Sequence, residues 1–280
     1  MADVSIFSHE FVLNALKVSI IMGLLLAYLG VHVVGRGIVF VDLALGQISM
    51  LGVAFANYVE KDPTVVSIIF TMVGAFILSF VNVKDKRLKQ EAIIGIVYAV
   101  TSAVTVLLIS KAPHGESDIS EVLFGSLFTV TQSQIEVMGI AFGVMGLVHI
   151  IFRKRFFDLT EKFENRQVEH IGVFNIWNFL FYLTIGLAIV LAVRAGGVIP
   201  VFSYLVVPPV SAILLTRKKG SLVLIALVIS VLGSFFGVYF STEFDFPAGS
   251  SVVTILGVIF LLAALPRLFG GLRGKGTNVA

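Results

Sequence analysis

The feature that most constrains this chain is a series of apolar runs that recurs from one end of the sequence to the other. A helix needs about 20 apolar residues to cross the hydrocarbon core of a bilayer, and these runs are of that length. Hydrophobic residues make up 58% of the 280 residues and charged residues 13%, and the mean hydropathy is +1.02. These values exclude an ordinary soluble domain and predict an all-α, polytopic transmembrane helix bundle.

Charged and polar breaks divide the apolar runs into eight or nine spans, with nine as the working number. Four spans precede a long polar loop and five follow it. The expected spans are 11–34, 38–59, 64–83, 92–110, 135–152, 176–193, 198–216, 221–240 and 250–265.

The basic residues predict the orientation of the spans rather than a nucleic-acid partner. Sixteen of the 20 Lys and Arg residues fall in breaks on one side of the predicted membrane. Cytoplasmic loops carry an excess of Lys and Arg, so we expect the N-terminus outside and the C-terminus in the cytoplasm. Residues 1–10 lack a basic segment and a small-residue cleavage site, so no cleaved signal peptide is expected.

Asp42 is the carboxylate that lies clearly inside a predicted span. A charge at that depth is costly and by default indicates a functional site. Ser49 lies seven residues further along and shares the helical face of Asp42, whereas Gln47 is offset by more than a third of a turn. Asp42, Gln47 and Ser49 are therefore candidate residues of a substrate pathway. An ion pair between Asp42 and Arg36 at the cytoplasmic end of the span is the alternative.

Two histidines and three prolines also lie inside predicted spans. His32 and His149 have no partner at helical spacing for a two-ligand metal site, so we expect hydrogen-bonded packing residues. Pro200, Pro208 and Pro209 fall in one span, where each removes a backbone donor and bends or breaks the helix. Both a break that lines the pathway, with Pro208 as a candidate residue, and a kinked packing helix stay open.

The longest cytoplasmic connection, 153–173, predicts a short helix on the membrane surface. Asp158 is expected to cap this helix. A rigid helix between two spans suits contact with a partner protein, and a merely solvated connector is the alternative. The candidate coupling residues are Glu161, Glu164, Glu169 and Gly172.

No ATP-binding loop is expected in this chain. The nearest match, residues 270–277, has the wrong spacing for a phosphate-binding loop and follows no strand. Transport would therefore use either an ion gradient or a separate ATPase, and we expect no cofactor in the chain itself.

The chain resembles the permeases of manganese, zinc and iron ABC importers over nearly its whole length. Five blocks carry the resemblance in the same order: 42–55, 91–99, 120–127, 198–212 and 246–252. It implies a single permease domain, 1–280, of the type II importer kind, with a coupling segment at 153–173 and a cytoplasmic tail at 266–280. It also implies a homodimer in a prokaryotic inner membrane, a cytoplasmic ABC ATPase that uses ATP and Mg, and an extracytoplasmic substrate-binding protein.

The sequence departs from that family at the metal motif. The family pattern Gly-Asp-x-x-x-His, whose acid and histidine bind metal one turn apart, aligns with Asp42-Leu43 and with Gln47. Gln is a neutral and weaker ligand, so a metal site at Asp42 and Gln47 would be altered. An ion-coupled carrier or channel that uses Asp42 stays open as an alternative. An intramembrane enzyme would need Ser49 or Ser126 beside His149, and no nucleophile motif supports it.

Overall fold

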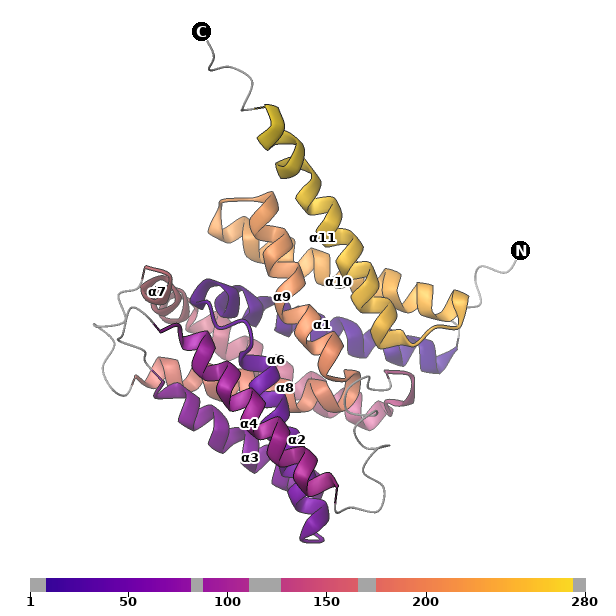
Figure 1. Ribbon diagram of the computed structural model, residues 1–280. Helices are drawn as coiled ribbons and strands as arrows, with labels where there is room; N and C mark the ends of the chain where they lie inside the picture. Colours follow the sequence, from indigo (N-terminus) through magenta and orange to yellow (C-terminus); the bar gives the residue numbers. More distant parts are fainter. Residues whose placement is uncertain (1–8, 82–87, 111–126, 166–174, 274–280) are drawn as a thin grey trace.

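The computed structural model describes residues 9–81, 88–110, 127–165 and 175–273, and these residues form a bundle of long helices (Figure 1). The elements are α1 Glu10–Arg36, α2 Val41–Tyr58, α3 Pro63–Ser79, α4 Gln90–Ile109, the 3-10 helix η2 Leu127–Thr129, α6 Gln132–Ile151, α7 Arg153–Glu164, α8 Ile176–Gly196, α9 Val198–Leu215, α10 Lys219–Phe244 and α11 Ala248–Arg273. The described residues contain no strand, which confirms the all-α prediction.

Every one of the nine expected spans coincides with a helix of the described chain. Seven of these helices are long and apolar enough to cross a membrane. The other two are α3, which has 17 residues, and α2, which carries Asp42 and Gln47. Because the apolar runs are separated by charged breaks, the positions of the helices follow directly from the hydropathy pattern.

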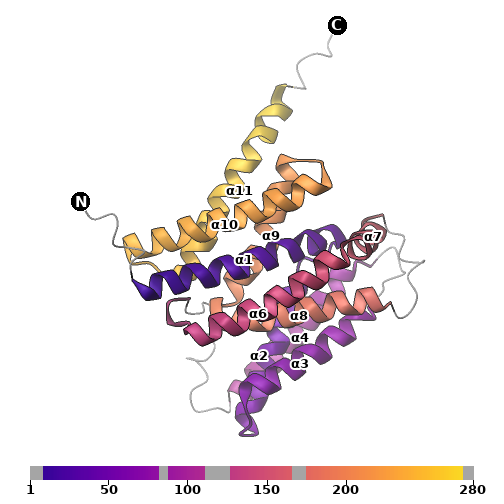
Figure 2. The ribbon, with the colours of Figure 1, turned by 180° about the vertical axis from the view of Figure 1, so that it is seen from behind.

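The first helix runs through the middle of the bundle. It packs against α9 and α10 on one side and against α6, α7 and α8 on the other. Figure 2 shows α1 between α10 and α6, with α7 at one end of this layer. The helices α2, α3, α4 and α8 form a second group, and α2 also contacts α9. The main hydrophobic core joins the two groups and includes Leu26, Phe181, Tyr182 and Tyr204, all fully buried.

Side-chain caps begin several of the helices. Asp62 precedes Pro63, the first residue of α3, and accepts hydrogen bonds from the backbone nitrogens of Thr64 (2.7 Å) and Val65 (3.1 Å). These bonds favour the ionised carboxylate and lower the pKa of Asp62 below its ordinary value. Thr131 and Gln134 form a reciprocal capping box at the start of α6.

The prolines of α9 do not break the helix, so of the two alternatives the structure favours the packing helix over a break. Pro208 and Pro209 lie inside a helix that runs without interruption from Val198 to Leu215, and both are buried. A proline at 209 cannot donate to the carbonyl oxygen of Leu205, four residues earlier. Gly30 of α1 packs directly against that carbonyl, and a Cβ at this position would overlap it. The proline segment is therefore a contact between α9 and α1, which only a glycine on α1 permits.

Two helix ends differ from the expectation. The helix α7 begins at Arg153, so Asp158 lies inside it and is not its cap. It begins earlier because four of its residues, Phe156, Leu159, Thr160 and Phe163, form a buried face against the bundle. At the other end of the chain, α11 continues to Arg273 through Pro266, well past the expected end at residue 265.

Candidate functional site: the start of α2 and the α7 cluster

Asp42 lies at the start of α2, just after the turn that connects α1 to α2. Gly37 ends α1 in the left-handed conformation (φ 66°), which glycine adopts without strain. Asp42 is the second residue of α2 and is only 3% exposed. Its Oδ1 atom has no hydrogen-bond partner among the described residues. A buried carboxylate oxygen without a donor is unfavourable unless a proton, a cation or a donor reaches it, so this oxygen is a candidate ligand atom.

Gln47 and Ser49 are also buried on α2, at 9% and 4% exposed. Gly46, beside Gln47, faces the start of α9: a Cβ there would lie 3.9 Å from Val198 Cγ2. Pro208 is ten residues further along α9, or roughly 15 Å at the rise of an α-helix. Its neighbour Pro209 lies against α1 at Gly30. The described structure thus keeps Asp42, Gln47 and Ser49 together on one helix and separates Pro208 from the α2 contact with α9.

Arg36, the last residue of α1, does not pair with Asp42. Its Nε donates to Thr160 Oγ1 of α7 (3.2 Å) and its Nη1 donates to Asn178 Oδ1 of α8 (3.1 Å). The guanidinium carbon lies 3.7 Å from the centre of the Phe181 ring, which is the geometry of a cation–π contact. The arginine is 7% exposed, and it forms no ion pair within the described part of the chain. The alternative in which Arg36 neutralises Asp42 is therefore wrong.

His32 binds the same threonine as Arg36, one turn earlier on α1. Its Nδ1 lies 2.9 Å from Thr160 Oγ1. The Thr160 hydroxyl donates to the Phe156 carbonyl (2.9 Å), so its oxygen accepts from both α1 side chains and His32 carries its proton on Nδ1. We call His32, Arg36, Thr160 and Asn178 the Arg36 cluster. Asn178 extends it to α3, because its Nδ2 donates to the Ser79 carbonyl (2.8 Å).

His149 is a packing residue, as predicted. Its Nε2 lies 2.9 Å from Thr184 Oγ1, and its ring stacks on Phe156 with centroids 4.1 Å apart. His32 likewise has a hydrogen-bond partner, so each histidine is hydrogen-bonded through one ring nitrogen, while His32 Nε2 and His149 Nδ1 have no partner among the described residues. Among the residues that the structure describes, no three His, Cys, Asp or Glu side chains gather in a metal-binding group.

The exposed side of α7 carries two of the predicted coupling residues. Glu161 forms an ion pair with Lys219 at the start of α10, with 2.9 Å between Oε2 and Nζ, and Glu164 is the last residue of α7. Glu169 and Gly172 lie outside the described residues. The opposite face of α7 holds Thr160 of the Arg36 cluster, so one short helix connects a solvent-facing charged surface to the buried end of α1.

Sequence reasoning missed the Arg36 cluster. Arg36 was counted among the charges of a loop, although it ends α1 and is buried. Its partners Thr160 and Asn178 are 124 and 142 positions away, so no local pattern connects them. The available signal was the spacing of His32 and Arg36, which lie four residues apart and therefore on one helical face.

The long apolar helices are those of a polytopic helical membrane protein, with buried polar side chains at α2 and the amphipathic helix α7 between two of the apolar helices. Comparison with known families then identifies its kind. A profile of the ABC 3 transport family matches residues 8–267. The chain belongs to the ABC 3 transport family.

Individual relatives agree with this assignment. The manganese transport system membrane protein MntC of Listeria innocua is 30% identical over 264 residues, which cover 93% of this chain and 92% of that protein. The high-affinity zinc uptake system membrane protein ZnuB of Haemophilus influenzae is 26% identical over 92% of this chain and 98% of its own length. The solved structure of PsaBC from Streptococcus pneumoniae in complex with Fab has a TM-score of 0.76 at 22% identity and covers 93% of each chain, which shows a shared fold.

Proposed function

We propose that this chain is the membrane-spanning permease of an ABC importer for a divalent metal ion, manganese, zinc or iron, or for a metal chelate. A separate cytoplasmic ATPase would supply the energy, an extracytoplasmic substrate-binding protein would deliver the cargo, and a second copy of the permease would complete the pathway. Family membership and the metals in the names of MntC and ZnuB support the substrate class.

The observation that carries the proposal is the buried Asp42 carboxylate with an oxygen that no described residue satisfies. Divalent cations bind oxygen ligands of this kind, and the cargo would occupy the site only in passing. Gln47 stands where the family pattern has its histidine, but its side chain points roughly 140° away from that of Asp42, so Asp42 alone is the proposed ligand on this helix. A hard cation or a chelate would suit such a site better than a metal that prefers imidazole.

The Arg36 cluster supports a path from the ATPase to Asp42. The exposed charged face of α7 is the surface that a cytoplasmic partner would move. Thr160 on the other face of α7 is hydrogen-bonded to both His32 and Arg36, so a displacement of α7 would pull on the end of α1. The turn at Gly37 follows, and α2 begins with Asp42 close behind it. In alternating access, a rigid shift of α7 would then be transmitted through the end of α1 and would change the position of Asp42 at the start of α2.

The test is metal uptake into proteoliposomes that hold the permease and its ATPase, with the binding protein outside. Uptake of radioactive manganese or zinc is expected to require ATP and to fall in D42N, because the amide removes the negative charge from the pathway. D62N is the matched control, since Asp62 is an exposed cap at the start of α3. ATP-dependent transport that is unchanged in D42N would refute the assigned site.

The alternative function predicts a different result in the same experiment. An ion-coupled carrier or channel would move the cation through the permease alone, without ATPase or nucleotide. ATP-dependent uptake of a chelate with no uptake of the free ion would retain the importer and change its cargo.

A further inference from the structure

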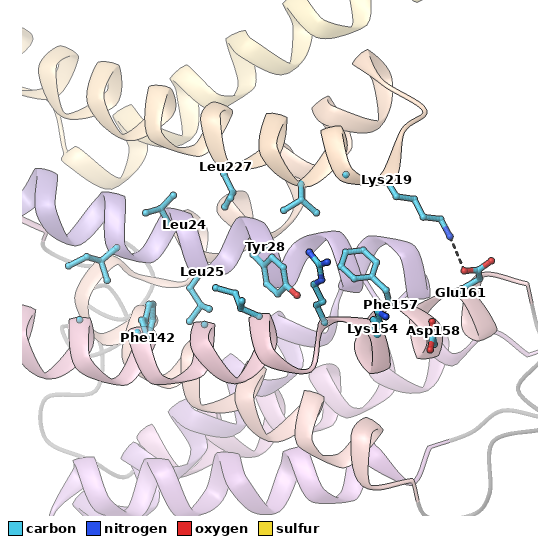
Figure 3. A pocket seen from close by; sticks show the side chains of 18 residues that line it. Leu24, Leu25, Tyr28, Phe142, Lys154, Phe157, Asp158, Glu161, Lys219 and Leu227 are labelled. Carbon is cyan, nitrogen blue, oxygen red and sulfur yellow. Dashed lines mark hydrogen bonds and ion pairs between the residues drawn. The ribbon is translucent and has the colours of Figure 1, made fainter.

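A groove of about 870 Å³ lies between α1, α6, α7 and α10, away from Asp42 (Figure 3). Along most of its length the walls are apolar: Ile21, Leu24, Leu25, Phe142, Ile150 and Leu227. One wall is a row of glycines on α6, at positions 139, 143 and 146. A Cβ at Gly143 would meet no atom within 4 Å, so the glycines leave real space beside the helix.

The lining of the groove is charged, not apolar, at the end where α6 ends and α7 begins. Figure 3 shows the leucines and Phe142 along one part of the groove and Lys154, Asp158, Glu161 and Lys219 at the other. Lys219 and Glu161 neutralise each other at 2.9 Å. Arg153 and Lys154 also line this end and form no ion pair within the described part of the chain. Apart from the Lys219–Glu161 ion pair, this end of the groove therefore has two cationic side chains, Arg153 and Lys154, and one carboxylate, Asp158.

The start of α10 adds further positive potential to this end. Gly220, in the first turn of this 26-residue helix, lines the groove, and the N-cap residue Lys218 makes no side-chain cap hydrogen bond. The first-turn amides of such a helix favour a nearby anion. Tyr28 lies between the apolar and charged parts, which is the position aromatic side chains prefer at the membrane interface.

We propose that this groove binds one phospholipid with an anionic headgroup. Its acyl chain would lie along the apolar walls beside Gly143, and its phosphate would lie between Arg153 and Lys154 and the start of α10. The apolar part and the cationic end of the groove match the two parts of an amphiphile. A soluble anion would contact only the cationic end and would leave the apolar walls uncovered. Basic pockets between transmembrane helices at the membrane surface recognise anionic lipid headgroups. The inference needs only a membrane-spanning chain and does not depend on metal transport.

The test is native mass spectrometry of the full-length permease in detergent, mixed with dioleoylphosphatidylglycerol or with dioleoylphosphatidylcholine. The wild type is expected to retain the anionic lipid in preference to the zwitterionic one. R153Q/K154Q is expected to reduce that preference by roughly tenfold or more, because each basic residue near an anionic lipid contributes substantially to binding. R155Q/K162Q is the matched control, since it removes the same charge from α7 outside the groove.

A second variant tests the apolar part. A Cβ at position 143 would meet no atom within 4 Å, so G143L is expected to occupy the groove and reduce retention of both lipids, whereas G257L, at an equally open glycine on α11, is not. Equal retention of the two lipids by the wild type, or equal losses in the two charge variants, would overturn the proposal. So would a G143L chain that retains lipid but loses a second permease copy, because the groove would then be a subunit interface.

Discussion

At the scale of single residues, the spacing of the polar groups on α2 decides what Asp42 can bind. Asp42 and Gln47 are five residues apart, and each residue turns a helix by about 100°, so their side chains point roughly 140° apart. Two ligands on one helix reach the same ion when they are four residues apart. Gln47 therefore lies one turn from Leu43, which offers no ligand atom.

This geometry predicts the result of restoring a ligand pair. L43D/Q47H places a carboxylate and an imidazole one turn apart, and it should bind zinc or manganese more tightly than the wild type by roughly an order of magnitude, a change of about 1.4 kcal/mol. Q47H alone should gain much less, because its nearest acid remains Asp42 on another face. Titration calorimetry on the purified permease measures both. If Q47H alone matched the double variant, the spacing argument would fail.

Sequence predicts this site only in part. The burial of Asp42 follows from its place inside an apolar run, and the structure agrees. The alternative, an ion pair with Arg36, is wrong, because it rested on closeness along the chain. Arg36 instead binds Thr160 and Asn178, whose approach depends on the packing of α7 and α8 against α1. Long-range contacts of this kind leave no trace in a single sequence.

At the scale of helices, α7 is connected to the bundle by a few specific contacts. Its threonine hydroxyl accepts from two side chains of α1, and Phe156 and Phe163 cover the same region. Hydrogen bonds to a buried charged group contribute more than neutral ones, roughly 1.5–3 kcal/mol each. We therefore expect α7 to move together with the end of α1.

We therefore expect T160V to uncouple ATP hydrolysis from transport. The valine keeps the shape of threonine but removes the hydroxyl, so Arg36 and His32 lose their common acceptor and the free energy of unfolding falls by roughly 1–3 kcal/mol. The decisive measurement is the ratio of metal taken up to ATP hydrolysed in proteoliposomes, which should fall severalfold. T160S, which retains the hydroxyl, should stay close to the wild-type ratio.

A purely structural defect is the main alternative explanation, and G30A tests it. The added Cβ overlaps the Leu205 carbonyl and destabilises the contact between α1 and α9 without touching the Arg36 cluster. Overpacking of this kind costs typically about 1–3 kcal/mol. If G30A lowered the ratio of uptake to hydrolysis as much as T160V at a similar loss of thermal stability, the Arg36 cluster would have no special part in coupling.

The helices themselves were the most predictable part of the fold. Their positions follow from apolar runs separated by charges, whereas the errors fall where tertiary contacts replace local preference. The start of α7 at Arg153 is set by its buried face, and the continuity of α9 through Pro208 and Pro209 is supported by α1 at Gly30. Neither contact can be derived from the local sequence.

At the scale of the whole molecule, the uneven distribution of Lys and Arg between the two sides predicts how the chain is oriented in the membrane. Single introduced residues can test that orientation. The chain has no cysteine, so any introduced thiol is the only one present. Lys61, between α2 and α3, and Lys218, between α9 and α10, are both exposed and should lie on opposite sides of the membrane. The Lys and Arg distribution places Lys218 with the cytoplasmic cluster and Lys61 outside.

A membrane-impermeant maleimide applied to intact cells should therefore label K61C and not K218C, and K218C should react once the cells are opened. The unmodified chain controls for background labelling. Among the described helices, α3, α4, α6, α8 and α9 lie between the two positions, and we expect each of these five to cross the membrane, which is an odd number of crossings. Labelling of both residues from outside would mean that one of these five helices does not cross, and the reverse pattern would place α7 and its exposed charged face outside. In that case no cytoplasmic ATPase could reach α7, and the coupling path through Thr160 and Arg36 would have to be abandoned.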